Sequence, residues 1–184
     1  MPETTTNPDP MSTDIDLSQL TLMDALDLAT LDEEEARQRY KMFAAQFGQS
    51  GSGHDAGTFF ASMAENEAKH GAALRARRVE MFGDVPMNVA LYDLYDVEAP
   101  GMGAPRRGMS AVQAFEIGLA AEQKAYDFFD QALPGIKDPD VVALFTELRD
   151  EEAEHLRMLQ EAMAKLPPSA AVEVEFDPDD IPYL

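Results

Sequence analysis

Apolar side chains recur with helical spacing in four separate stretches of the chain. Within each stretch they alternate three and four residues apart, which places them on one face of an α-helix. A Gly-rich run ends the first stretch, Pro134-Gly135 ends the third, and Asp138-Pro139 supplies an N-cap and a first-turn proline to the fourth. The pattern predicts amphipathic helices over residues 19–47, 55–82, 110–133 and 139–166.

The residues expected to face the core share this spacing. They are Leu22, Leu26, Ala29, Ala36, Tyr40, Phe43 and Phe47 in the first helix, Phe60, Met63, Leu74 and Met81 in the second, Val112, Phe115, Leu119, Tyr126, Phe129 and Leu133 in the third, and Val141, Phe145, Leu148, Leu159, Ala162 and Leu166 in the fourth.

The lengths of the connections predict how these helices are arranged. Short links join the helices of each pair, whereas residues 83–108 form a long connection rich in Pro and Gly. The sequence therefore predicts an all-α fold, a four-helix bundle of two antiparallel helical hairpins joined by a long crossover, over residues 17–166. Residues 1–16 are expected to be a disordered N-terminal arm, and residues 167–184, which begin with a Pro pair, an acidic C-terminal tail.

Six polar residues interrupt the apolar stripes. A buried, unpartnered carboxylate is very costly, so four glutamates on core-facing positions need a compensating partner. All four interruptions lie at similar distances from their helix starts, which predicts that they meet at one depth of the bundle. The interrupting residues are Glu33, Glu67 and His70, Glu122, and Glu152 and His155.

Two of these interruptions have the form Glu-x-x-His. This spacing puts a carboxylate and an imidazole one turn apart on the same helix face, where both can hold one ion. Two such motifs and two lone glutamates are the ligand set of di-iron and di-manganese carboxylate bundles. Four carboxylates neutralise two divalent cations, and these ligands suit Fe or Mn, with Zn left open. The acidic runs 32–35 and 150–154 need no further explanation beyond Glu33 and Glu152, and their other members are expected to be solvated.

The amino-acid composition limits the classes of partner and metal site that this protein can have. Against 35 Asp and Glu the chain has 14 Lys and Arg, for a formal net charge of −21, which argues against binding nucleic acid or an anionic membrane. No apolar run suits a signal peptide or a membrane span. The chain has no Cys, so thiolate metal sites and disulfides are excluded and the cytoplasm is the expected compartment. His54, in the Gly-rich run, is expected to be a solvated loop residue.

The first helix also resembles a known family. The run from Glu33 to Tyr40 is similar to the first-helix signature of rubrerythrins, in which the ligand Glu is followed by Ala three residues later and Tyr seven residues later. Glu122, Ala125 and Phe129 repeat this frame in the third helix. The resemblance covers about residues 19–166. It implies a ferritin-like bundle that holds two Fe ions and reacts with dioxygen or hydrogen peroxide.

The sequence departs from rubrerythrins in two respects. The chain lacks the cysteines of a rubredoxin-type iron domain, so the resemblance is to rubrerythrin-like proteins without that domain, and an external electron donor is implied. Rubrerythrins also carry a further metal-binding Glu in the third helix, where this chain has Ala125 and Tyr126, while Glu116 lies one position off the core-facing stripe. Peroxidase activity does not follow from the resemblance alone.

These observations favour a ferroxidase or peroxidase type oxidoreductase, which we expect to be a homodimer. Tyr40 either hydrogen-bonds a ligand carboxylate or only packs in the core. The alternatives are a metal-storage or buffering protein, a di-metal oxidase of an organic substrate with Tyr92 and Tyr95 near an access channel, and a metal-free scaffold bundle.

Overall fold

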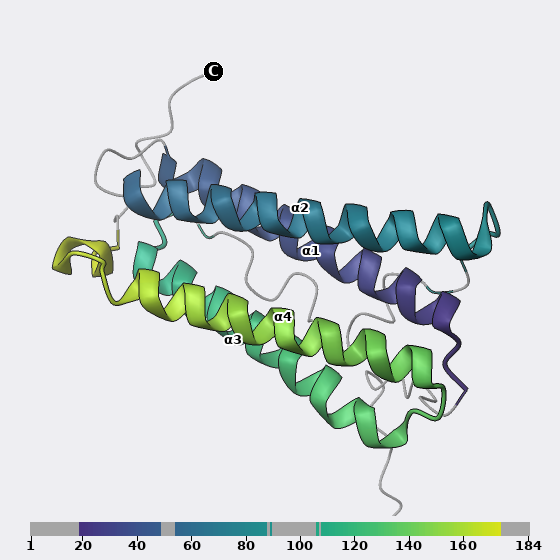
Figure 1. Ribbon diagram of the computed structural model, residues 1–184. Helices are drawn as coiled ribbons and strands as arrows, with labels where there is room; N and C mark the ends of the chain where they lie inside the picture. Colours follow the sequence, from purple (N-terminus) through teal and green to yellow (C-terminus); the bar gives the residue numbers. More distant parts are fainter. Residues whose placement is uncertain (1–18, 49–53, 88, 90–105, 107, 174–184) are drawn as a thin grey trace, which may run out of the picture.

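The structure is a bundle of four helices. The computed structural model describes residues 19–48, 54–87, 89, 106 and 108–173. Its helices are α1 (Leu22–Gly48), α2 (His54–Phe82), α3 (Ala111–Ala132) and α4 (Pro139–Met163), with the short 3₁₀ helices η2 (Leu133–Gly135) and η3 (Pro168–Ala171). Figure 1 shows α1 beside α2 and α3 beside α4, as two hairpins packed against each other. The all-α, ferritin-like bundle predicted from the sequence is confirmed.

The helix ends agree with the local sequence signals to within a few residues. Ser110 caps α3 through a capping box with Gln113. Asp138 caps α4, and Pro139 occupies its first turn. The fourth helix ends at Met163, three residues earlier than expected. His54 was expected to lie in a loop, but α2 begins at this residue.

The apolar core is divided into two clusters, and each contains residues from all four helices. One contains Leu26 of α1, Leu74 of α2, Phe129 of α3 and Phe145 of α4. The other contains Phe43, Phe60, Phe115 and Leu159 from the same four helices. On each helix the predicted polar interruption falls between the two clusters, so the clusters flank a polar layer at mid-height of the bundle.

The core-facing stripe of α3 differs from the prediction. Phe115 and Phe129 are buried as expected, but most of the remaining stripe consists of small residues. Alanine and glycine at these positions let α3 approach its neighbours closely, which moves the larger side chains towards the rim of the interface. Val112, Leu119, Tyr126 and Leu133 are accordingly only half-buried, and Ala111, Ala114, Gly118, Ala125 and Ala132 are buried instead.

Three further core predictions need correction. Met81, near the end of α2, is 49% exposed, whereas its neighbour Phe82 packs against the first apolar cluster. Ala162 and Leu166, at the end of α4 and just after it, are half-buried rather than buried.

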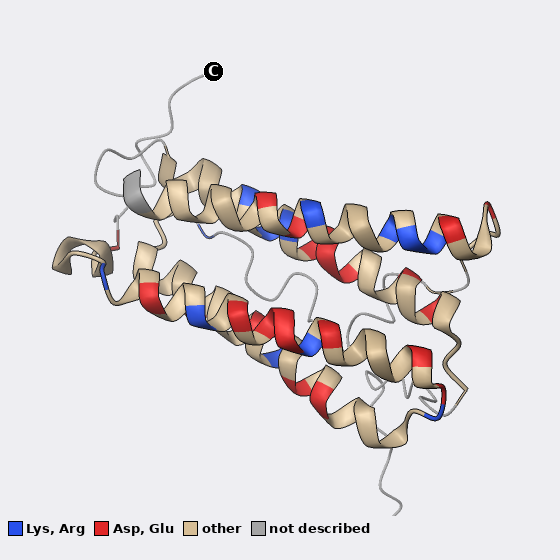
Figure 2. Cartoon of the chain, in the orientation of Figure 1, with Lys and Arg blue, Asp and Glu red and all other residues tan. Residues whose placement is uncertain are grey.

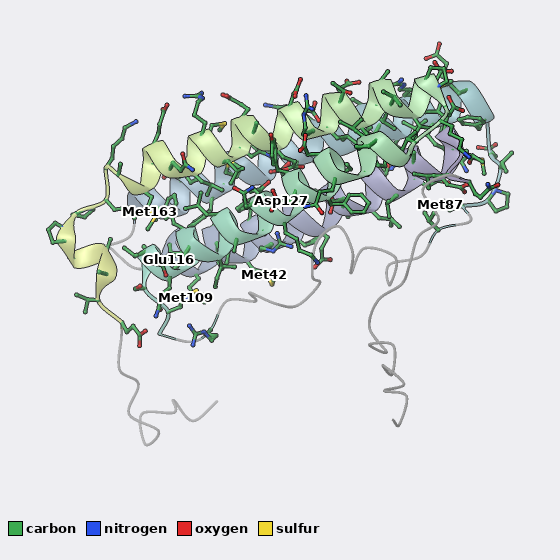
Figure 3. The ribbon with its side chains drawn as sticks, turned by 90° about the horizontal axis from the view of Figure 1, so that it is seen from below. Met42, Met87, Met109, Glu116, Asp127 and Met163 are labelled. Carbon is green, nitrogen blue, oxygen red and sulfur yellow. The ribbon has the colours of Figure 1, made fainter. Side chains whose placement is uncertain are left out.

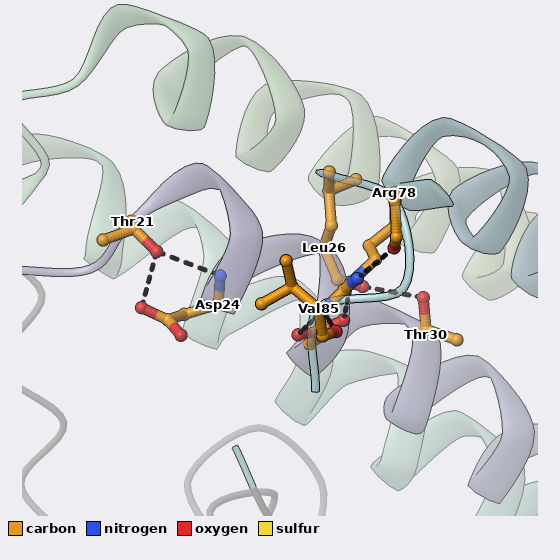
Figure 4. Close-up of polar contacts among 8 residues, drawn as sticks. Thr21, Asp24, Leu26, Thr30, Arg78 and Val85 are labelled. Atoms are coloured by element: carbon orange, nitrogen blue, oxygen red, sulfur yellow. Dashed lines mark hydrogen bonds and ion pairs between the residues drawn. The ribbon is translucent and has the colours of Figure 1, made fainter. Parts of the chain in front are cut away.

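A buried ion pair ties α1 to the end of α2 (Figure 4). The Arg78 Nε–H donates to Asp27 Oδ1 at 2.8 Å. The same guanidinium donates to the backbone carbonyls of Gly83 and Val85, at 2.8 and 2.6 Å. Each charge of the pair is therefore matched by hydrogen bonds, which a buried ion pair requires. The contacts fix where the chain leaves α2.

Several sequence predictions fall on residues that the structure does not describe. The N-terminal arm at residues 1–16, most of the crossover with Tyr92 and Tyr95, and residues 174–184 lie outside the described residues. Residues 167–173 are described: η3 lies within them, and Ala170 is buried against the second apolar cluster. None of the described helices has the length and apolar character needed to cross a membrane.

Candidate metal centre

The structure brings together all six residues that interrupt the apolar stripes. Figure 2 shows acidic segments at mid-length on α1 and α4, which belong to different hairpins. Five of the six side chains are buried, and His70 is half-buried. Every helix contributes to this cluster: Glu33 from α1, Glu67 and His70 from α2, Glu122 from α3, and Glu152 and His155 from α4.

Carboxylates from three helices surround His155. Its Nδ1 lies 3.4 Å from Glu122 Oε2 and 3.6 Å from both Glu67 Oε1 and Glu152 Oε2. Two donor atoms that each lie about 2.1 Å from one metal ion are themselves roughly 3–4 Å apart. The spacing around His155 therefore suits a shared ion.

His70 forms the other half of the cluster. Its ring stacks on that of His155, with centroids 5.4 Å apart and planes inclined by 10°. Its Nδ1 lies 3.9 Å from Glu33 Oε1 and 3.9 Å from Glu151 Oε2. Donor atoms fall into three groups in which all atoms lie within 4.8 Å of one another: Glu67, His70 and His155; Glu33, His70 and Glu151; and Glu122, Glu152 and His155.

Glu151 is the member of these groups that the sequence analysis missed. It precedes Glu152 and lies off the apolar stripe of α4, so it was expected to be solvated. In the structure its side chain is 32% exposed and its carboxylate faces His70 of α2. Glu116, which lies one position off the core-facing stripe of α3, is exposed (Figure 3).

The buried carboxylates hold protons unequally. Burial raises the pKa of Glu33 to about 8, although a hydrogen bond with Glu67 partly opposes this. Burial and the nearby charge of Glu122 also raise the pKa of Glu152. Burial would raise the pKa of Glu122 too, but hydrogen bonds from Glu152 and Tyr40 and the neighbouring His155 imidazole outweigh it and lower that pKa to about 2. The pKa of Glu122 is thus lowered, whereas those of its neighbours Glu152 and Glu33 are raised.

The two histidines are shifted in opposite directions. Burial alone would lower the pKa of His155, but the carboxylate of Glu122, 3.4 Å from its Nδ1, and the charges of the other surrounding glutamates raise it. For His70, burial and the neighbouring charge of His155 lower the pKa. His155 is therefore the imidazole that carries positive charge most readily in the metal-free cluster.

Tyr40 hydrogen-bonds a carboxylate of the cluster and also packs in the core, so it combines the two alternatives that the sequence left open. The fully buried Tyr40 hydroxyl donates to Glu122 Oε1, linking α1 to α3. The ring is also part of the core, with its centroid 5.9 Å from that of Phe60. Gly118 makes room for this arrangement, since a Cβ there would lie 3.5 Å from the Tyr40 hydroxyl and 3.2 Å from Leu159.

The cluster contains buried donor atoms that fit a metal ion. Among the described residues, Glu33 Oε2, His70 Nδ1, Glu152 Oε2 and His155 Nδ1 are buried without a hydrogen-bond partner. Buried polar atoms are seldom left unpaired in proteins, and an ion that is not represented is one explanation. Carboxylate and imidazole donors in this number suit one or two divalent cations such as Fe or Mn.

Comparisons with known proteins agree with this geometry. The search of curated proteins finds no match. Among solved structures, the chain is similar to the crystal structure of an uncharacterized conserved protein from Magnetospirillum magnetotacticum MS-1. The two are 25% identical, with a TM-score of 0.67, and the match covers 80% of this chain and 97% of the other. The family model for rubrerythrin matches residues 24–163, which include all four helices almost in full. The chain therefore belongs to the rubrerythrin family.

Proposed function

We propose that the protein is a non-haem di-iron oxidoreductase that binds Fe(II) and reacts with dioxygen or hydrogen peroxide, as a ferroxidase or a peroxidase. The observation that carries this proposal is the set of buried, unpaired donor atoms where four helices meet. Membership of the rubrerythrin family supports it. Manganese is the second metal that the same donors would accept.

In this proposal the six residues share two metal ions. Glu33, Glu67 and His70 would hold one ion, and Glu122, Glu152 and His155 the other. The hydrogen bond from Tyr40 fixes one oxygen of Glu122 and leaves the other directed towards His155. The four carboxylates balance the charge of two divalent cations, which offsets the cost of burying them.

Two bound Fe ions would supply the electrons that reduce the oxidant. The chain has no Cys and therefore no thiolate iron centre of its own to replace these electrons. Electrons for a further turnover would come from fresh Fe(II) or from an external donor. We further propose a homodimer that acts in the cytoplasm.

Anaerobic Fe(II) titration followed by exposure to oxidant tests the proposal. We expect two tightly bound Fe per chain and rapid oxidation by dioxygen or hydrogen peroxide. Variants Glu67→Ala and Glu152→Ala should lose metal, whereas Glu154→Ala, on the exposed face of α4, should retain it. Absence of tight Fe or Mn binding to the purified chain would rule the proposal out.

The number of Fe bound per chain and the size of the particle distinguish the alternatives. A storage protein would take up many more than two Fe per chain and form a large shell, which light scattering would detect. An oxidase of an organic substrate would need a cavity that reaches the cluster. One cavity, of about 400 Å³, is lined by Phe59, Phe115 and Met158 among others, and by none of the six cluster residues. The cavity that His70 lines measures only about 100 Å³. This observation favours the small oxidants.

A further inference from the structure

The half-buried side of the cluster faces the groove between α2 and α4. A small cavity of about 100 Å³ opens there, and His70, Arg77, Glu147 and Glu151 are among the residues that line it. His70 belongs both to this cavity and to the cluster, so the cavity connects the surface with the candidate metal centre.

Carboxylates become progressively less exposed along this path. The side chain of Glu147 is 60% exposed, that of Glu151 32%, and that of Glu33 6%. Glu33 and Glu151 each place a carboxylate oxygen 3.9 Å from the Nδ1 of His70. A cation that moves inward would therefore meet a carboxylate at each stage.

Two buried atoms indicate that the inner end of this path is built to receive a ligand. Glu33 Oε2 and His70 Nδ1 are buried and lack a hydrogen-bond partner. The donor atoms of Glu33, His70 and Glu151 all lie within 4.8 Å of one another, which is close enough to share one ion. The unpaired oxygen of Glu33 distinguishes this group from an ordinary patch of surface acid.

The positively charged side chain of Arg77 lies at the outer end of this path. Arg77 Nη1 lies 3.3 Å from Glu147 Oε2, which joins α2 to α4 across the opening. The Arg77 and Glu147 side chains are 37% and 60% exposed, so solvent screens the pair and it contributes little to stability. Its positive charge does, however, oppose the approach of a metal cation.

We propose that Glu151, together with the di-metal ligands Glu33 and His70, forms an outer divalent-cation site, where a metal ion binds before it reaches Glu67, Glu122 and Glu152, with the Arg77–Glu147 pair at its mouth. The inference rests on the proposed metal-binding function. It assigns Glu151 a role in the uptake of metal rather than in the final di-metal site, and it assigns Arg77 the role of slowing that uptake.

Stopped-flow absorbance with Co²⁺ as the probe tests this assignment in the metal-free chain. In Glu151→Gln we expect the uptake rate to fall about tenfold, because a carboxylate that attracts the cation is lost. The final stoichiometry should remain that of the wild type. Glu154→Gln removes the same charge from an exposed position one turn away on α4 and should leave the rate unchanged. Arg77→Gln should raise the rate severalfold, whereas Arg75→Gln, which removes the same charge from another face of α2, should not.

Each outcome decides a separate point. If the wild-type chain binds no Co²⁺, the proposed function itself fails. If it binds Co²⁺ but Glu151→Gln and Glu154→Gln take it up equally fast, only the outer site is overturned. The same holds if Glu151→Gln lowers the final stoichiometry without slowing uptake. Thermal unfolding of the metal-free variants verifies folding, and Glu151→Asp, which keeps the charge, should show an intermediate rate.

Discussion

The hydroxyl of Tyr40 on α1 donates a hydrogen bond to the carboxylate of Glu122 on α3, and so joins the two hairpins at the level of the polar cluster. Burial and the nearby charge of Glu122 raise the pKa of Tyr40, which keeps this hydroxyl a donor. The contact gives Tyr40 a role in orienting a candidate metal ligand as well as in packing.

Tyr40→Phe should separate these two roles. The ring would still pack on Phe60, but the buried Glu122 carboxylate would lose its hydrogen-bond donor. We therefore expect the free energy of unfolding of the metal-free chain to fall by about 1–3 kcal/mol. Metal affinity should fall about tenfold or more, as for other hydrogen-bond partners of metal ligands. Tyr126→Phe, at a half-buried position of α3, is the matched control. Equal metal affinity in both variants would show that Tyr40 only packs.

Glu152→Gln should affect the metal-free and the metal-bound chain in opposite directions. The substitution keeps the shape of the side chain but removes a carboxyl group buried beside Glu122, so the metal-free chain should unfold at the same or a higher temperature. In the wild type, Mn²⁺ at a hundred times its dissociation constant should stabilise the fold by about 2.7 kcal/mol. Glu152→Gln should lose most of this gain.

Thermal unfolding with and without Mn²⁺ measures both effects, and Glu154→Gln is the control for loss of charge. A metal-free scaffold would behave differently, because added metal would stabilise none of the three chains.

The raised pKa of Glu33 predicts how the metal-free chain responds to pH. A carboxyl group whose pKa is about 8 in the folded state and near 4.5 when unfolded makes folding less favourable as pH rises between these values. The raised pKa of His155 acts in the same direction above pH 6.5. The lowered pKa of His70 opposes the trend only below its unfolded value near 6.5. Between pH 6.5 and 8 we therefore expect the unfolding temperature of the metal-free chain to fall.

Metal binding should release the protons held by Glu33 and Glu152. Calorimetric titration at pH 7 in two buffers of different ionisation enthalpy would measure this release, and we expect at least one proton per chain. The apparent affinity should rise with pH over the same interval. An affinity independent of pH would contradict the protonation states described above.

Two glycines that flank the link between α1 and α2 should respond differently to the same substitution. A Cβ on Gly57 would lie 2.6 Å from the backbone nitrogen of Gly48, a contact that only movement of the backbone could relieve. Gly57→Ala should therefore destabilise the chain by about 2 kcal/mol, even after the gain in helix propensity. A Cβ on Gly48 meets nothing within 4 Å, so Gly48→Ala should be neutral or slightly stabilising. Chemical denaturation of both variants measures the contrast.

The buried ion pair at the end of α2 should be sensitive to the loss of its acid. Asp27→Ala leaves the Arg78 guanidinium buried with only the carbonyls of Gly83 and Val85 as partners. We therefore expect the free energy of unfolding to fall by about 3 kcal/mol. The exposed pair of Arg157 and Glu161 on α4 provides the comparison, and Glu161→Ala should have little effect. Similar unfolding temperatures for the two variants would show that the buried pair does not anchor the helix end.

Much of this architecture could be predicted because it repeats along single helices. The helical period located the four helices and placed Glu33 and His155 on core-facing positions before any contact between helices was known. It could not locate Glu151, whose approach to His70 depends on how α4 is rotated against α2. The small-residue stripe of α3 was missed for a related reason: Gly118 and Ala125 carry little hydrophobic signal, although their small size decides how closely the helices pack.

The division of the core into two apolar clusters has a consequence for how the molecule unfolds. The layer between them offers unpaired polar atoms instead of apolar packing, so it couples the two ends of the bundle weakly when no metal is present. Each end could then open by itself, in the manner of a separate foldon. An ion held by ligands from all four helices would couple both ends, and a molecule with two partly independent halves would become one cooperative unit.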